Sequence, residues 1–185
     1  MAERETIKRH RLAEFPTPKT LRLVTAVAFL FTAAIFFVFR VHDRPLQPYD
    51  IVAFELAWTP QKAETIMGVW GEAGSQTARE SLLIDFGYMP AYSFLFAGMT
   101  LMAARAVSGW QQTLGFVLTF APFMSAVSDA TENFALLSVL QSPDSPSAAA
   151  LTLAGVCATL KFSLLVICLL YMLGVVIYRG VRRAR

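Results

Sequence analysis

The residues of this sequence best suited to chemistry lie between Ser125 and Leu140, in a mostly apolar stretch that contains Asp129, Glu132 and Asn133. At 100° per residue, these three side chains share one face of a helix. Ionisable groups inside an apolar helix are costly and usually point into a cavity or at a partner. We therefore expect this face to line a pocket or to meet an opposite charge.

Asp85 and Lys161 are the expected partners of that face, because helices would carry the charges to nearly one depth. Depth is measured along each helix from an anchoring residue at its cytoplasmic end. At ~1.5 Å per residue, the lengths are about 30 Å from Arg105 to Asp85, about 28 Å from Trp110 to Asp129 and about 27 Å from Arg179 to Lys161. These positions lie near the outer edge of a ~30 Å hydrocarbon layer. The charges therefore either share a pocket or mark only the membrane boundary, with no common site.

Within a shared pocket, Asp129 and Lys161 form the natural ion pair, since pairing removes much of the penalty of burying either charge. Asp85 and Glu132 are then left without a certain cation. Two nearby carboxylates do not both ionise cheaply at low dielectric, so one should hold a proton or a cation. With Asn133 they offer only oxygen ligands, which suit Mg²⁺, Ca²⁺ or Mn²⁺, although a proton does the same job.

Tyr88 and Tyr92 share a helix face with Asp85, so we expect them to line the pocket wall and supply hydroxyl groups. The complete predicted ligand-binding set is Asp85, Tyr88, Tyr92, Asp129, Glu132, Asn133 and Lys161. No residue is assigned a catalytic role. Haem held by two histidines inside the bundle is excluded, because His10 and His42 both lie outside the apolar runs. The two cysteines match no metal or redox spacing and are expected to be buried thiols.

Composition indicates which elements hold these residues: 56% of the 185 residues are hydrophobic and 16% are charged, with a mean hydropathy of +0.52. Such a chain is too apolar for an ordinary soluble domain, and its long apolar runs are typical of an integral membrane protein. We predict an all-α fold, a four-helix membrane bundle with spans at about 21–39, 81–104, 110–140 and 148–178. These spans form one transmembrane domain over 21–178, between basic tails at 1–20 and 179–185.

The long connection at 40–80 contains a predicted amphipathic helix. Thr59-Pro60 is a good helix start, with a capping hydroxyl before a proline in the first turn. Gly71 and Gly74 end this helix, and a capping box at Thr77–Glu80 opens the second span. The apolar face recurs at helical spacing and consists of Ala63, Ile66, Met67 and Trp70. The helix either lies in the membrane interface or covers the outer end of the bundle as a lid.

Basic residues predict the orientation of the chain. Both termini and the turn at 105–109 carry Lys or Arg, whereas the loop at 141–150 carries none. The positive-inside rule then places both termini in the cytoplasm, which agrees with an even number of spans. Twelve arginines against four lysines hint at a GC-rich bacterial genome, so we expect a multi-pass protein of a bacterial inner membrane.

Three functions fit these features. The first is an outward-facing acidic pocket that binds or transports a cation, a proton or an amphipathic small ligand. The second is an accessory or structural subunit whose polar face meets another membrane subunit. The third is a membrane-embedded enzyme acting on a lipid, with Asp85 and Glu132 as acid and base, although no nucleophile with an adjacent base is visible. Membrane lipid is the expected partner of the basic tails, and nucleic-acid binding is not supported.

Overall fold

The computed structural model describes residues 11–184, and over this range the chain forms helices and connecting turns without any strand. The elements in chain order are α1 (Arg11–Glu14), α2 (Pro18–His42), the 3-10 helix η1 (Arg44–Leu46), α3 (Ile51–Glu55), α4 (Pro60–Ala104), α5 (Trp110–Leu118), α6 (Ala121–Gln141) and α7 (Ala148–Ala184). Helices α2, α4 and α7 and the α5–α6 pair are each long and apolar enough to cross a membrane. The predicted all-α fold with four long apolar segments is therefore confirmed. Residues 1–10 and 185, which belong to the predicted tails, lie outside the described range.

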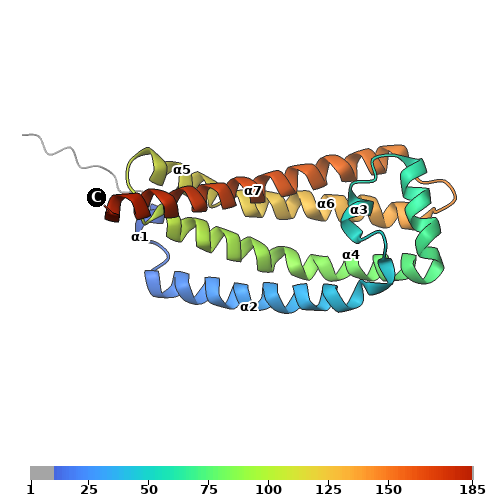
Figure 1. Cartoon of the computed structure of the whole chain (residues 1–185), viewed down its shortest axis with the longest axis horizontal. Coiled ribbons are helices and arrows are strands. Elements are labelled where there is room, and N and C mark those ends of the chain that lie inside the picture. Colours follow the sequence, from blue (N-terminus) through green and yellow to red (C-terminus); the bar gives the residue numbers. More distant parts are fainter. Residues whose placement is uncertain (1–10, 185) are drawn as a thin grey trace, which may run out of the picture.

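The long helices run roughly side by side along the longest axis of the molecule (Figure 1). Helices α6 and α7 pack on each other and on α4, whereas α2 packs on α4 and has at most marginal contact with α6 or α7. Helix α2 therefore lies at the edge of the assembly. One end of the molecule, here called the terminal end, holds α1, α5 and the C-terminal end of α7. The opposite end, the lid end, holds η1, α3 and the loop at 142–147.

The first and last long helices extend beyond the predicted spans. Thr17 caps α2, because its hydroxyl accepts a hydrogen bond from the Thr20 amide at 3.2 Å, and Pro18 occupies the first turn. A proline is tolerated there because the first amides of a helix have no intrahelical partner. Helix α7 continues to Ala184, so the predicted tail at 179–185 is helical over its described residues.

The helix predicted in the long connection starts at Thr59-Pro60 and breaks at Gly71 as expected, whereas Gly74 and the predicted capping box lie inside a helix. Thr59 caps α4, its hydroxyl accepting from the Lys62 amide at 3.4 Å. Gly71 leaves the helical conformation at φ 63° and ψ −166°, and this positive φ, which glycine adopts without strain, turns the chain. The helix resumes directly after this turn, so the predicted capping box is wrong. Thr77 lies inside α4, where its hydroxyl donates to the Ala73 carbonyl at 3.1 Å.

Residues 60–70 of α4, here called the lid helix, lie across the lid end of the bundle (Figure 1). The apolar face of the lid helix is buried, and Trp70 is only 6% exposed. The indole Nε1 of Trp70 donates to the carbonyl oxygens of Leu46 and Tyr49, at 2.8 and 2.9 Å. Of the two predicted roles, the packing supports the lid, because this apolar face meets the protein itself.

The predicted third span is divided into two helices that run on in nearly one direction (Figure 1). Helix α5 ends at Leu118, and α6 begins at Ala121 with Pro122 in its first turn. A proline in the interior of a continuous helix would remove a hydrogen bond and clash with the preceding turn. The break before Pro122 avoids that cost.

Candidate functional site

A buried ion cluster joins α3, α6 and α7. The Nζ atom of Lys161 lies 2.7 Å from Asp129 Oδ1, 3.1 Å from Glu132 Oε2 and 3.2 Å from Glu55 Oε2. None of these side chains is more than 7% exposed. The predicted Asp129–Lys161 pair is present, but the ammonium is shared among three carboxylates. We call these four residues the lysine cluster.

Glu55 is the member of the lysine cluster that sequence reasoning missed. It ends α3, which begins after Asp50, whose carboxylate accepts from the Ala53 amide at 2.9 Å. Burial raises the pKa of the Glu55 carboxyl, and the charge of Lys161 opposes that rise. The available signal was a lone acid in the apolar run 51–57, since a buried charge needs a partner. That partner, Lys161, lies 106 positions later in the sequence, so only the tertiary fold identifies it.

Asp85 and Asn133 meet beside the lysine cluster. The Asn133 side-chain amide donates to Asp85 Oδ2 at 2.9 Å and to the Leu82 carbonyl at 3.1 Å. Asn133 is fully buried, and its Oδ1 has no hydrogen-bond partner within residues 11–184. Over the same residues, the ion pairs include none to Asp85. Asp85 is thus contacted by a neutral amide where the other carboxylates contact an ammonium.

Both predicted tyrosines lie on the same part of α4 as Asp85. The hydroxyl of Tyr92 donates to Asp129 Oδ2 at 2.8 Å and so links α4 to the lysine cluster. The ring of Tyr88 packs edge-to-face against the rings of Tyr92 and Phe39, at centroid separations of 5.4 and 5.5 Å. The seven predicted residues are therefore brought to one region, which favours a shared site over charges scattered along a boundary.

The distribution of partners corrects one expectation. The sequence predicts Asp85 and Glu132 as the unpaired carboxylates, but Glu132 is wrong in that role because Lys161 binds it. In the described part of the chain, the ammonium of Lys161 contacts the carboxylates of Glu55, Asp129 and Glu132, and Asp85 lies beside them as a fourth acid. One positive charge does not balance four negative charges at low dielectric, so full ionisation of all four carboxyl groups would be costly.

A cavity of about 420 Å³, here called the chamber, lies between α2, α4 and α7 beneath α3. Its polar end is formed by Glu55, Asp85, Asp129 and Lys161. Much of the remaining wall is aromatic, from the rings of Phe36, Phe39, Tyr88, Tyr92, Phe96 and Phe162. Small-molecule sites commonly combine such apolar walls with a few convergent polar groups.

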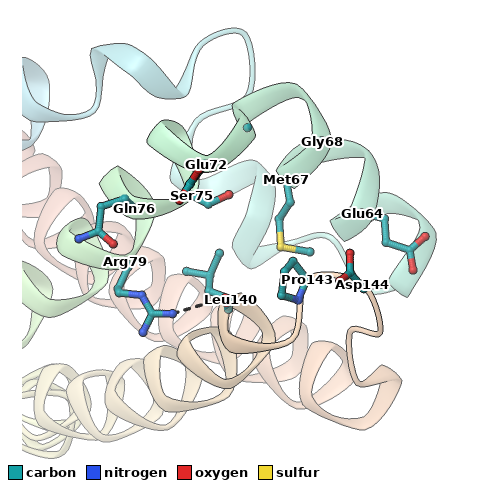
Figure 2. A pocket seen from close by; sticks show the side chains of 11 residues that line it. Glu64, Met67, Gly68, Glu72, Ser75, Gln76, Arg79, Leu140, Pro143 and Asp144 are labelled. Carbon is teal, nitrogen blue, oxygen red and sulfur yellow. Dashed lines mark hydrogen bonds between the residues drawn. The ribbon is translucent and has the colours of Figure 1, made fainter.

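A second, larger hollow of about 710 Å³ lies at the lid end, between α4 and the loop at 142–147 (Figure 2). The acids Glu64, Glu72 and Asp144 line it. Arg79 also faces it and donates to the Leu140 carbonyl at 3.4 Å. Arg79 is therefore held away from the lysine cluster and does not neutralise it.

The geometry does not support a divalent metal site. Within residues 11–184, no three His, Cys, Asp or Glu side chains are arranged to hold a metal ion. In the lysine cluster, the ammonium of Lys161 occupies the position between the carboxylates that a metal would take. The oxygen ligands predicted from the sequence are therefore used to bind Lys161 or, at Asp85, a neutral amide.

Ser81, a serine that lines the chamber, is not activated as a nucleophile. Ser81 donates to Asp43 Oδ1, and His42 Nδ1 lies 3.0 Å from the same carboxylate oxygen. The carboxylate thus stands between the serine and the histidine. An activated serine needs the opposite order, in which the base contacts the hydroxyl directly.

No protein-family profile, no curated protein and no solved structure matches this chain. Its function therefore has to be inferred from the chemistry of the site. The informative features are the excess of buried carboxylates and the aromatic walls of the chamber.

Proposed function

We propose that this protein crosses a bacterial inner membrane four times as a helix bundle, and that its chamber binds a small cation in exchange for a proton. In this proposal we take both termini as cytoplasmic, because the terminal end carries Arg105, Arg182 and Arg183 while the loop at 142–147 has no Lys or Arg. The long connection at 40–80 has four basic residues, but its six acids offset them, and it is long enough to be translocated. The lid helix then lies at the outer membrane surface, where its exposed polar side meets water.

The observation that carries the proposal is the state of Asp85. Its carboxylate is held by a neutral amide at 2.9 Å, while the nearby ammonium is already shared by three other acids. A carboxylate in this position holds a proton until a cation arrives, because an uncompensated charge at low dielectric is costly. Binding of a cation then releases the proton.

The other two functions have less support. A subunit that uses its polar face to meet a neighbour would direct these charges outward, whereas here they converge inside the chain. An enzyme acting on a lipid would need an activated nucleophile or water, and the order Ser81–Asp43–His42 does not provide one.

The test counts the protons that leave the protein when a cation binds. Protein in lipid nanodiscs is titrated with tetramethylammonium, tetraphenylphosphonium and dodecyltrimethylammonium by calorimetry, in two buffers with different protonation enthalpies. We expect at least one of these cations to bind with release of about one proton, because one carboxylate changes from the acid to the ionised form.

The matched variants are Asp85→Asn, which should abolish proton release, and Asp144→Asn at the second hollow, which should not change it. The proposal is wrong if none of the three cations releases protons, or if Asp85→Asn releases as many as the parent.

A further inference from the structure

Between α2 and α7 the wall of the chamber reaches the molecular surface, and this place is here called the side opening. Helices α2 and α7 both border it and make at most marginal contact with each other. At this opening lie Phe36 of α2, 55% exposed, and Phe162 of α7, 36% exposed. Phe36 lies inside the span predicted at 21–39, so the gap beside it faces hydrocarbon and not water. A ligand that uses this opening must come from the lipid layer.

We infer that the ligand is a single-chain amphiphile with an ammonium head group, taken sideways from the membrane between α2 and α7. This inference rests on the proposed function and names its ligand class and route. The head lies at Asp85, and the hydrocarbon chain lies along the aromatic walls toward the opening.

The polar end of the chamber selects the sign of the head group. Lys161 is within 3.2 Å of each of three carboxylates, so it has no spare charge to attract an anion. Asp85 adds a fourth carboxylate, which has no ion pair within residues 11–184. A fatty acid or a phospholipid phosphate would fit the walls but meet a net negative end, whereas an ammonium is attracted to it.

Aromatic rings beside Asp85 suit the same head group. Tyr88 and Tyr92 lie one and two turns after Asp85 on α4. The ring of Phe39, on α2, packs edge-to-face against the ring of Tyr88. Aromatic faces attract alkylammonium groups and do so more strongly when the site is dry. The combination of one carboxylate with several rings is the chemistry that recognises protonated or quaternary amines.

The size and walls of the chamber suit one alkyl chain. Its volume of about 420 Å³ is in the lower part of the range for small-ligand sites, roughly 300–1,000 Å³. Because the side opening lies between Phe36 and Phe162, the end of a longer chain can remain in the lipid. A very short alkyl chain would therefore make too little contact with the walls, whereas a long chain is tolerated.

The experiment uses equilibrium dialysis to measure the uptake of radiolabelled dodecyltrimethylammonium by nanodiscs that contain the protein. Protein-free nanodiscs are the reference. Tetramethylammonium tests the need for the chain, and dodecyl sulfate tests the need for the positive charge. We expect dodecyltrimethylammonium to bind more than about tenfold tighter than tetramethylammonium, since burying alkyl groups favours binding. Dodecyl sulfate should show no uptake above protein-free nanodiscs.

The route is tested with two neighbouring phenylalanines of α2. Phe36 lines the chamber, while Phe37 is 69% exposed and does not line it. Phe36→Ala should weaken dodecyltrimethylammonium binding by about tenfold, the worth of roughly one good aromatic contact. Phe37→Ala should leave it unchanged, and equal melting temperatures of both variants exclude a folding defect.

Each outcome decides a separate point. Equal affinity for tetramethylammonium and dodecyltrimethylammonium, with proton release, overturns the amphiphile and leaves the proposed cation exchange standing. Uptake of dodecyl sulfate equal to that of the cation overturns the head-group assignment. Equal weakening by Phe36→Ala and Phe37→Ala overturns the side opening. Absence of both binding and proton release overturns the inference and the proposed function together.

Discussion

The two halves of this bundle differ in what their interiors contain. In the half near the terminal end, here the terminal half, small residues let helices approach closely: Gly98 lies against Thr25 of α2, and Gly115 lies against Tyr171 of α7. In the half near the lid end, the chamber half, the interior contains the lysine cluster and the chamber. Both halves pack closely, since Gly155 lies against Trp58 and the larger apolar core is in the chamber half, but among the described residues the buried ion cluster is found in the chamber half alone.

This difference suggests what the charges are for. Small residues stabilise membrane helix pairs through close packing, which carries no electrostatic penalty. Buried ion pairs give little net stability, and apolar replacements of similar volume are often neutral or stabilising. Since the same chain builds an uncharged interior in its terminal half, the charges of the chamber half are better explained by a task than by stability.

The largest expected effect comes from removing the one cation of the lysine cluster. Lys161→Ala leaves three buried carboxylates without their ammonium, and breaking a buried ion pair from one side costs about 3–5 kcal/mol. We expect a low folded yield and a large fall in the melting temperature of the detergent-purified protein. Lys62→Ala, at an exposed lysine of the lid helix, is the control and should melt like the parent. A Lys161→Ala variant with the parent melting temperature would show that the chamber half does not depend on its charges.

The next effect tests the terminal half. A Cβ at Gly115 would lie 2.5 Å from the Cβ of Ala104 and would overlap the Tyr171 hydroxyl, which donates to the Gln111 carbonyl. Gly115→Ala should therefore destabilise the fold by about 1–3 kcal/mol, as overpacking typically does. Gly174→Ala should cause no loss, because the added Cβ would meet no described atom within 4 Å other than those of its own stretch of helix. Thermal unfolding measures both variants, and a Gly115→Ala protein as stable as Gly174→Ala would contradict close packing here.

The part of this architecture that is visible in the sequence is the part set by local rules. Long apolar runs give the four long segments, because the length needed to cross a membrane is a property of each segment alone. The common depth of Asp85, Asp129 and Lys161 is also predictable, because each residue of a helix adds a constant rise, so the number of residues from the helix end gives the depth. That Tyr88 and Tyr92 share a helix face with Asp85 is predictable for a similar reason, because α4 is a continuous helix over these residues.

The remainder depends on which segments meet. Glu55 reaches Lys161 only because η1 and the turns around α3 fold the connection over the bundle, and no periodicity in the sequence encodes that path. The peripheral place of α2 is likewise invisible, because its apolar residues do not say whether they face helix or lipid. The capping box at Thr77–Glu80 fails because the same residue types are tolerated inside a helix, where Thr77 bonds the preceding turn.

A smaller effect concerns the pH dependence that Glu55 gives the chamber half. Burial raises its pKa from the ordinary 4.5, so the folded state binds this proton more tightly than the unfolded state. The resulting stability is complete below about pH 4.5 and is lost as the pH rises through the folded pKa. Each pKa unit corresponds to about 1.4 kcal/mol. Glu55→Gln should flatten the decline of the melting temperature above pH 4.5, and an unchanged slope would assign the titration to other groups.

The smallest effect on stability, and the sharpest test of the comparison, is expected for Asp85→Asn. The new amide can still accept the hydrogen bond from Asn133, so the packing of α4 on α6 is preserved. Because no cation is lost and a neutral amide replaces a carboxyl group that holds a proton, the free energy of unfolding should change by less than about 1 kcal/mol. Cation-coupled proton release should nevertheless disappear, since the proton held at this position no longer exists. Gly115→Ala should show the reverse, with lower stability and normal proton release in the folded fraction. If Asp85→Asn instead unfolds the protein as Lys161→Ala does, Asp85 is needed for stability. The charges of the chamber half would then be structural, and the difference between the two halves would not indicate a function.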